Sequence, residues 1–406
     1  MEVYVIGGGA SGMMAALTAA EKPRCRVHLL ERQSRPARKL LATGNGRCNL
    51  TNLDQDERHY HAGDPAALFA LRAFDAHAAL AFFSRLGLVT VAEDTGRVYP
   101  FSDSANSVAD VLRFALAAAG VDVQCAQEVT AIRRVKSGFT VVTADAERHA
   151  DRVIIACGGP AGSRLGGTKS GLDLLRSLGH SVTALTPSLV QLKTDTTWVR
   201  SLKGVRAEAD LALFTGGELA AASGGEVQFT DYGVSGPAVF DLSREAARCA
   251  GRSELVLDLM PLLELPALEA LLFERARRFP ALTGEDLLTG VLHNRLGRTM
   301  VRYAGLSFEA PLSSLGDADI RAVAAAVKDF RLPVTGTMGF DGAQVTCGGA
   351  DLSQFDPETL ESRLAPGLYA CGEVLDVDGD CGGYNLQWAW SSGRLAGQLK
   401  RREGAL

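Results

Sequence analysis

The chain has 406 residues, of which 47% are hydrophobic and 22% are charged. This balance excludes an intrinsically disordered chain, and the length predicts two or three domains. The formal net charge of −5 gives the chain no general attraction to a polyanion, so we expect no DNA partner.

Eight cysteines occur without a Cys-x-x-Cys pair or the Cys/His spacing of a metal site, so we expect reduced thiols and no bound metal. Reduced thiols are typical of a cytoplasmic location. The chain has no uninterrupted apolar stretch of about 18 residues, and its opening apolar run lacks a basic region. We therefore expect neither a membrane span nor a signal peptide, and a monomer is compatible with the sequence.

The first 31 residues follow the order of a dinucleotide-binding βαβ unit. An apolar run at 1–6 predicts a buried parallel strand, and the glycine-rich turn 7–12 follows at once. A helical pattern at 13–21 and a second apolar strand at 27–30 come next, and Glu31 ends that strand. All the parts of the motif are therefore present in the right order.

Each residue of this turn has a physical task. Gly7 permits a tight turn, Gly9 lets the backbone approach a pyrophosphate, and Gly12 lets helix and strand pack closely. The helix N-terminus attracts the phosphates, and Glu31 can accept hydrogen bonds from ribose hydroxyls, which argues against NADP here. The predicted cofactor contacts of this region are Gly7, Gly9, Ala10, Ser11, Gly12, Glu31 and Arg32.

The segment 38–52 concentrates cations, glycines and small polar residues. One interpretation is a loop that follows the pyrophosphate to the redox ring, with Lys39 and Arg47 as charge partners. The alternative is a solvated basic helix end followed by a turn. The predicted contacts are Lys39, Leu40, Gly46, Arg47, Cys48, Asn49 and Asn52.

The next part of the chain mixes helices and strands. Apolar periodicity predicts helices at 65–86 and 107–120, separated by a loop at 96–102 that either faces a substrate or only ends a helix. Alternation at 121–129 and 139–143 predicts strands of a meander beside the parallel sheet.

A further buried strand at 152–159 ends in small residues and would return the chain to the nucleotide. Val129, Ala156 and Gly158 are therefore predicted cofactor contacts, Val129 through a backbone amide that meets the adenine. A glycine-rich turn at 166–171 opens a helix that ends near His180, for which capping is a better explanation than catalysis.

The pattern changes between 191 and 334. Short alternating stretches separated by glycines predict a small β-barrel, and a helical part follows it. Its clustered arginines are either a solvated helix face or a docking surface for a phosphate-rich substrate. The expected strands are 189–192, 209–215, 218–222, 226–230 and 255–259, and the expected helices are 265–278, 284–305 and 320–330.

The C-terminal part returns to the sheet through 336–350 and a strand at 368–373, whose Glu373 could hold a ribityl chain. Residues 381–393 begin with glycines and continue as a helix. Its N-terminus would stabilise the negative charge of a reduced flavin, while its Trp and Leu residues pack. The predicted contacts are Gly372, Glu373, Gly383, Tyr384, Asn385 and Leu386.

Motifs along the whole chain resemble the BaiN/RdsA family (YhiN-type) of NAD(P)- and FAD-dependent oxidoreductases. The matching segments are VIGGGASGMMAA, RKLLATGNGRCNLTN, GRVYPFS, FTDYGVSGPAVFDLSR, TGTMGFDGAQVTCGGADL and LYACGEVLDVDGDCGGYNLQWAWSSG.

The resemblance implies an α/β fold whose Rossmann-like FAD-binding domain, 1–190 and 335–406, is split by an inserted β-barrel plus helical domain, 191–334. It also implies NAD(P)H-driven reduction of a conjugated C=C bond, since members of the family act on rRNA uridine or on unsaturated 3-oxo bile acids. Asp231 and Ala350 depart from the family pattern and indicate a divergent branch, in which the substrate can differ.

The predicted reaction needs a hydride, a proton and a way to polarise the substrate. Candidate proton donors are Tyr384, Tyr99 and Cys347, and Arg47 could polarise a carbonyl. FAD is expected to bind without a covalent bond, and NAD(P)H to bind transiently near 158–171, because no second GxGxxG motif is present. Two alternatives remain open: a reductase of rRNA uridine and a flavin- and RNA-binding protein without turnover. The substrate, the nicotinamide and the direction of reaction are left open too.

Overall fold

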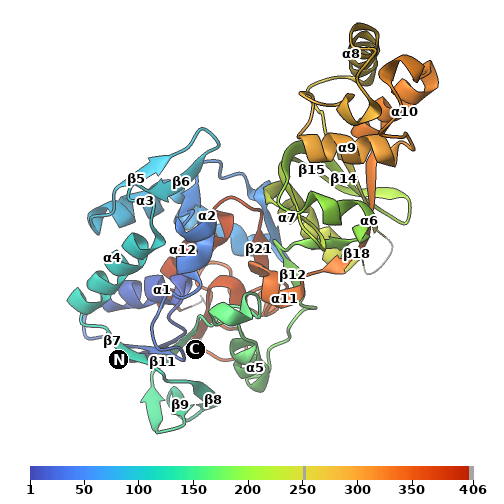
Figure 1. Cartoon of the computed structure of the whole chain (residues 1–406). Coiled ribbons are helices and arrows are strands. Elements are labelled where there is room, and N and C mark those ends of the chain that lie inside the picture. The colour runs from blue at the N-terminus through green and yellow to red at the C-terminus, as the bar shows by residue number, and fades with distance from the viewer. Residues whose placement is uncertain (250–252, 402–406) are drawn as a thin grey trace. The chain divides into compact units, whose positions relative to one another are not determined.

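The computed structural model describes residues 1–249 and 253–401. It divides into two compact units: a first unit of Met1–Thr186 with Gln344–Leu406, and a second unit of Pro187–Ala343. Figure 1 colours both by residue number. These limits differ by a few residues from the division expected from the sequence, and the expected spans as folding domains stay a prediction.

The first unit is built on a five-stranded parallel sheet with the strand order β20-β11-β1-β2-β7. Its central strand is buried on both faces, which explains its continuous apolar sequence. The carboxyl ends of these strands share one edge, where ligands bind in folds of this class. The strands are β1 (Glu2–Ile6), β2 (Arg26–Glu31), β7 (Asp122–Cys125), β11 (Arg152–Ile155) and β20 (Leu368–Ala370).

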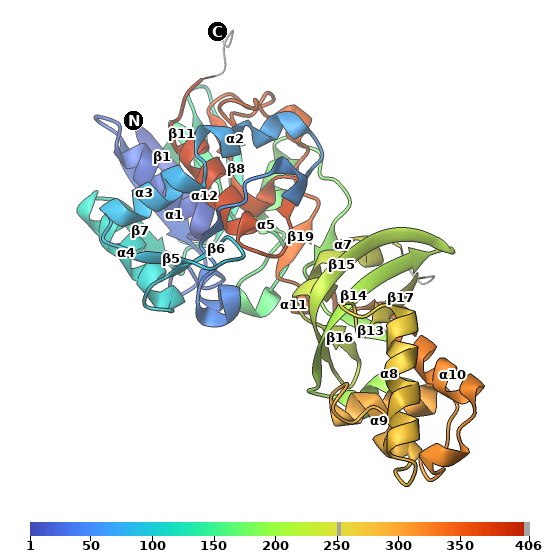
Figure 2. The same ribbon diagram turned by 90° about the horizontal axis from the view of Figure 1, so that it is seen from above.

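Helices α1 and α12 lie against each other over this sheet, although they come from opposite ends of the sequence (Figures 1 and 2). Trp388 and Trp390 of α12 are almost fully buried in the hydrophobic core of the first unit. The main helices of this unit are α1 (Ala10–Ala20), α3 (Ala76–Arg85), α4 (Ala105–Ala118), α5 (Ser170–Ser177) and α12 (Tyr384–Gly397).

Three expectations for this unit are wrong in detail. The helix expected at 65–86 is broken, because Asp75 accepts a hydrogen bond from the Ala78 amide (2.7 Å) and so caps a new helix. The loop expected at 96–102 contains a strand, because Val98 and Tyr99 are buried between two neighbouring strands. The elements are a 3₁₀ turn (Pro65–Leu68), α2 (Phe69–Ala73), β3 (Thr51–Asn52), β5 (Thr90–Ala92) and β6 (Arg97–Pro100).

The strand expected at 121–129 is divided, because Ala126 takes a left-handed conformation (φ 56°). Its first half, β7, joins the parallel sheet beside β2, and only its end enters the antiparallel meander. The meander consists of β8 (Val129–Arg134), β9 (Phe139–Thr143) and β10 (Glu147–Ala150). This unit also contains an antiparallel pair of strands from distant parts of the chain, β4 (Tyr60–Ala62) and β21 (Val377–Gly379). A further strand is β19 (Val345–Cys347).

The second unit contains a closed six-stranded barrel with the order β13-β16-β15-β14-β17-β18. The stretches 218–222 and 226–230 form one strand rather than two, because Gly224 and Gly225 pair with β14 instead of turning. Helix α7, β16 and β18 were not expected. The elements are β13 (Leu192–Thr194), β14 (Arg206–Thr215), β15 (Glu218–Phe229), β16 (Gly233–Ser235), α7 (Pro237–Arg248), β17 (Ser253–Asp258) and β18 (Phe330–Thr337).

The described part of the second unit contains five further α-helices, of which α8, α9 and α10 are the longer ones. The helix expected at 284–305 is limited to α9, because the His293 side chain accepts from the Arg295 amide (3.3 Å) and caps the helix there. The helices are α6 (Thr196–Val199), α8 (Leu265–Arg278), α9 (Asn294–Tyr303), α10 (Asp317–Lys328) and α11 (Gly339–Gly342).

Among residues 1–249 and 253–401, no single helix is both long enough and apolar enough to cross a membrane. One bent pair, Pro65–Ala73 with Ala76–Arg85, passes that test by length and composition alone.

Candidate active site

The N-terminus of α1 has the geometry of an anion site. A Cβ at Gly12 would lie 1.9 Å from the carbonyl oxygen of Gly7, so glycine is required there for the turn and helix to pack. Gly9 caps the helix without a side-chain hydrogen bond, and a Cβ on it would meet no atom within 4 Å. The helix start is therefore uncapped by a side chain and leaves room at Gly9 for a ligand, as phosphate binding requires.

Glu31 closes this turn from the end of β2. Its two carboxylate oxygens accept hydrogen bonds from the amides of Gly8 and Gln33, both at 2.7 Å. Each oxygen keeps a further lone pair, so Glu31 can still accept from a ribose hydroxyl. Arg32, in contrast, donates to the carbonyl of Gly166 (3.0 Å).

Segment 39–52 is a kinked loop with left-handed backbone at Gly44, Asn45, Gly46 and Cys48. The side chain of Cys48 is buried, and burial raises the pKa of its thiol to about 12. Cys48 therefore stays a neutral thiol at physiological pH.

The two cations predicted for this loop have protein partners. Lys39 forms an ion pair with Glu373 (2.7 Å), whose other oxygen accepts from the Thr346 amide (2.9 Å). Lys39, predicted to contact the pyrophosphate, and Glu373, predicted to contact the ribityl chain, therefore contact each other.

Arg47 stacks on the Tyr99 ring, with 4.0 Å between its guanidinium carbon and the ring centroid. It also forms ion pairs with Asp103 and, at 3.1 Å, with Glu93. The positive charge of Arg47, which was predicted to polarise a substrate carbonyl, is therefore already balanced by two carboxylates.

The loop after Cys48 is fastened to the N-terminus of α12. Trp390 Nε1 donates to the Leu50 carbonyl (2.9 Å), and Asn52 Nδ2 donates to the Gly382 carbonyl (3.0 Å). A Cβ at Gly383 would lie 2.6 Å from the Thr51 carbonyl oxygen. Two segments separated by more than 300 positions therefore form one wall of the site.

Two predicted amides differ in what they bind. Asn385 exchanges hydrogen bonds with the backbone of Gly379, with Oδ1 accepting at 2.9 Å and Nδ2 donating at 2.7 Å, so it braces the loop before α12. The Oδ1 atom of Asn49 is buried without a hydrogen-bond partner among the residues that the structure describes. Such an orphaned acceptor fits a cofactor that brings its own donor.

The three candidate proton donors lie on different elements. Tyr384 is the first residue of α12, and its side chain is 5% exposed. Its pKa is raised to about 12, mainly by burial and further by the negative charges of Asp54 and Asp380. Burial also raises the pKa of Tyr99 in β6. Cys347 is buried at the end of β19.

The remaining predicted contacts come from several elements of the first unit. Ala156 follows β11 and packs on Gly7, and Gly372 follows β20 and donates its amide proton to Ser392 Oγ (2.9 Å). Val129 is buried at the start of β8. The others are placed as follows: Ala10 and Ser11 in the first turn of α1, Leu40 buried beside it, Gly158 in a left-handed conformation after β11, and Leu386 partly buried in α12.

Sequence reasoning missed an acceptor and a cluster of ionisable groups. The side-chain oxygen Oε1 of Gln127 is buried with no partner in the described part of the chain, while the backbone amide of Gln127 donates to the Glu31 carbonyl (2.9 Å). His59 and His61 both contact Asp380, at 2.9 and 3.0 Å. The signal was available: two histidines stand two positions apart in a chain that has only seven.

His180 has a structural environment. It is buried, contacts Ser362 Oγ (2.9 Å) and stacks on Phe355 with 4.7 Å between ring centroids. Burial lowers its pKa, so it packs as a neutral ring.

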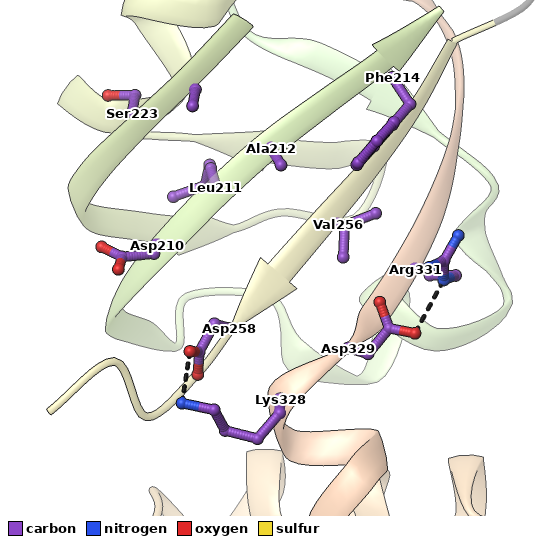
Figure 3. Close-up of a pocket in the computed structure, with 11 residues that line it drawn as sticks. Asp210, Leu211, Ala212, Phe214, Ser223, Val256, Asp258, Lys328, Asp329 and Arg331 are labelled. Atoms are coloured by element: carbon purple, nitrogen blue, oxygen red, sulfur yellow. Dashed lines mark hydrogen bonds and ion pairs between the residues drawn. The ribbon is translucent and has the colours of Figure 1, made fainter. Parts of the chain in front are cut away.

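The second unit has a groove of about 600 Å³ along β14, β17 and the start of β18. Figure 3 shows each of its two cations paired with an acid: Lys328 with Asp258 (2.5 Å) and Arg331 with Asp329 (2.9 Å). The groove therefore offers an apolar strip between ion pairs rather than unbalanced cations for phosphates.

A model of the family described as HI0933-like protein Rossmann domain matches residues 1–399. The chain belongs to this family. A relative from Clostridium scindens, the 3-dehydro-bile acid delta(4,6)-reductase, is 41% identical over 402 residues, 98% of each chain. The ribosomal RNA dihydrouridine synthase of Escherichia coli is 29% identical over 96% of each chain. Among solved structures, the open conformation of a flavocytochrome c3 fumarate reductase has a TM-score of 0.48 and 16% identity, covering 98% of this chain and 77% of that one.

These findings confirm the family resemblance seen in the motifs, and with it the assignment of this HI0933-like chain as an FAD-dependent oxidoreductase. The predicted fold class is confirmed as well: an α/β, Rossmann-type chain with a closed six-stranded barrel.

Proposed function

We propose that this chain reduces a conjugated C=C bond in a small molecule, with non-covalently bound FAD and with NAD(P)H as a transient co-substrate. The observation that carries the proposal is the 41% identity, over 98% of both chains, to a relative named as a bile acid delta(4,6)-reductase. The hydrogen bonds between segment 49–52 and the region of α12 support it as well, because they place that segment beside the candidate proton donor Tyr384 at the start of the helix.

The residues predicted from the sequence are proposed to hold FAD, which when bound supplies the hydride chemistry. The N-terminus of α1 balances the diphosphate charge, and Glu31 orients the ribose. The N-terminus of α12, which also lacks a side-chain cap, stabilises negative charge at the ring. Asn49 and Gln127 add two acceptors whose partners would be donors of the cofactor.

Tyr384 is the proposed proton donor. Its pKa of about 12 means that it holds its proton at neutral pH, and its position at the start of α12 places it beside the ring site. Tyr99 is instead covered by the Arg47 guanidinium, so the pair Arg47–Tyr99 is proposed to contact the substrate rather than to donate a proton.

NAD(P)H is proposed to bind transiently near 158–171. Gly158 leaves open space there, since a Cβ on it would meet no atom within 4 Å. No cysteine in the described part of the chain forms a disulfide, which supports the proposed cytoplasmic location.

Anaerobic rapid mixing tests this proposal. NADH or NADPH should bleach the yellow holoprotein, and a conjugated enone should then restore the oxidised spectrum while losing its C=C bond. A holoprotein that neither nicotinamide bleaches, or that no enone reoxidises, would contradict it.

A second candidate is the reduction of uridine in rRNA, which is favoured by the exposed arginines of α9. Arg295 donates to backbone carbonyls and Arg302 stacks on Phe308, and neither has a carboxylate partner among the described residues. The test is to measure dihydrouridine in rRNA of the source organism, of a deletion strain and of that strain complemented with this chain. Loss in the deletion strain and recovery on complementation would establish this function in place of the first.

A further inference from the structure

His59 is held between two carboxylates. Its Nδ1 lies 2.9 Å from Asp380 Oδ2, and its Nε2 lies 3.1 Å from Asp54 Oδ2. The backbone fixes this arrangement, because β4 pairs with β21 and the Asp380 amide donates to the His59 carbonyl (3.0 Å).

Both ring nitrogens of His59 face carboxylate oxygens. An ionised carboxylate only accepts hydrogen bonds, so both contacts are hydrogen bonds only if both ring nitrogens carry a proton. Both acids are ionised near neutral pH: the Asp56 amide, followed by His59, lowers the pKa of Asp54. Burial raises the pKa of Asp380, but hydrogen bonds from His61 and His59 lower it on balance.

The His59 ring lies flat on the ring of Tyr384, with 4.4 Å between centroids and 16° between planes. Tyr60 meets the same phenol edge-on, at 5.6 Å and 86°. The Tyr384 ring therefore contacts one ring on its face and another at its edge. The orientation of the His59 ring is fixed by its contacts with two carboxylates.

We propose that His59 is a positioning residue for Tyr384: clamped as a cation between Asp54 and Asp380, it fixes the phenol at the start of α12 so that its hydroxyl can protonate the substrate. This inference rests on the proposed function.

The step balances as follows. The alkene accepts a hydride, with both electrons, from the dihydroflavin at one carbon, and a proton from Tyr384 at the neighbouring carbon. The N–H bond of the reduced cofactor, the C=C π bond and the phenol O–H bond break, and two C–H bonds form. The cofactor would be oxidised and the alkene reduced, and the solvent then returns a proton to the phenolate.

Charges of both signs surround the phenol. Asp54 and Asp380 oppose formation of the phenolate, while Arg97 and Arg58 favour it. In the proposed arrangement, the imidazolium of His59 adds positive charge in direct ring contact and offsets the two acids during proton transfer. The other groups facing this cluster are His61, on the second oxygen of Asp380, Tyr60, and Asp56, beside Arg58.

The chain contains a matched control. His28 is also clamped by two carboxylates, Asp122 at 2.8 Å and Glu2 at 2.9 Å, and also stacks on a tyrosine, Tyr4, with 4.5 Å between ring centroids. It lies in the middle of β2, away from the strand's carboxyl end, where Glu31 marks the cofactor site. The same local structure is therefore present without the proposed role.

The experiment compares His59→Phe and His28→Phe in the holoprotein. Phenylalanine keeps an aromatic ring on the tyrosine but removes the charge and both hydrogen bonds. Bleaching by NAD(P)H should be unchanged in both variants, whereas reoxidation by the enone should slow by about tenfold or more in His59→Phe only. The solvent deuterium isotope effect on reoxidation should rise in the same variant, because proton transfer then limits the rate.

The charge state is read separately from activity. ¹⁵N NMR of the His59 ring in wild-type protein, assigned by its absence from His59→Phe, should show both nitrogens protonated at pH 7. If His59→Phe does not fold, His59→Gln replaces it in both measurements.

A neutral His59 ring at pH 7, or reoxidation of the variant within about twofold of wild type, would overturn the inference. Failure of wild type to be reoxidised by any enone would instead overturn the proposed function, and the NMR result would still stand as a test of the clamp.

Discussion

Helices α1 and α12 both begin at a glycine without a side-chain cap, yet their N-termini are built differently. The start of α1 comes from one contiguous stretch, and the charged side chain of Glu31 accepts a hydrogen bond from its turn. The start of α12 is assembled from distant segments and is surrounded by Tyr384, His59 and Asp380.

The difference separates binding from chemistry. A diphosphate needs only backbone N–H groups and a fixed dipole, which a short motif supplies. Proton transfer needs groups with shifted pKa values in defined orientations, which a fold supplies by bringing remote residues together. Four predictions test this division.

The largest effect is expected at the start of α1. Gly12→Val places carbon atoms within 1.9 Å of the Gly7 carbonyl and should abolish FAD binding through loss of the turn, measured by flavin absorbance and circular dichroism. Gly9→Ala is the matched change, because its Cβ meets no protein atom. It should leave the melting temperature of the apoprotein unchanged while weakening FAD binding. Equal losses of stability in both variants would contradict an open anion site at Gly9.

At α12, Tyr384→Phe should lower the rate of substrate reduction by about 10²-fold or more, since a positioned general acid contributes about that much. FAD affinity should hardly change, because the hydroxyl is proposed to serve the substrate. The control is Tyr60→Phe, which removes a neighbouring hydroxyl from the same aromatic group. If both variants reduce substrate at the wild-type rate, the proton comes from another group.

A smaller effect is expected from Glu31→Gln, which keeps one acceptor oxygen but loses the charge and one of two amide contacts. We expect FAD to bind about tenfold more weakly, equivalent to about 1.4 kcal/mol. Titration calorimetry of the apoprotein measures this, with the rate of substrate reduction at saturating FAD as control. A slower rate at saturation would mean that the α1 end also takes part in the chemistry.

The smallest effect concerns the pH dependence of stability near α12. The pKa of Asp380 is lower in the folded chain than its usual value, so its ion pairs stabilise the fold above about pH 4, and this stabilisation is lost as pH falls further. Asp380→Asn should therefore be less stable than wild type at pH 7, and the difference should shrink below about pH 4. Urea unfolding between these pH values measures it. A difference that is constant with pH would mean that packing, and not charge, is what Asp380 contributes.

The sequence predicted the parts of the fold whose signals are local. The turn at Gly7–Gly12, the strand ending in Glu31 and the helix beginning near Tyr384 needed only neighbouring residues. Local signals failed where tertiary contacts decided the conformation. Gly224 and Gly225 look like a turn but pair within one long strand, and residues 97–100 look like a loop but are buried between two strands.

The candidate site shows the same limit. The sequence could nominate Lys39, Glu373 and Arg47 as ligand contacts, but not that two of them form an ion pair or that the third stacks on Tyr99. His59 and Asp380 are 321 positions apart, and nothing in the chain order predicts their contact.

The sequence by itself determined the nucleotide-binding turn, the class of the fold and the family, because glycines in a fixed order and alternating or continuous apolar runs have few structural solutions. Only the tertiary structure decided which charges are already neutralised, which acceptors are left for a cofactor and which histidine is clamped onto Tyr384. These properties depend on distances between side chains from separate elements, and packing sets those distances after the elements have formed.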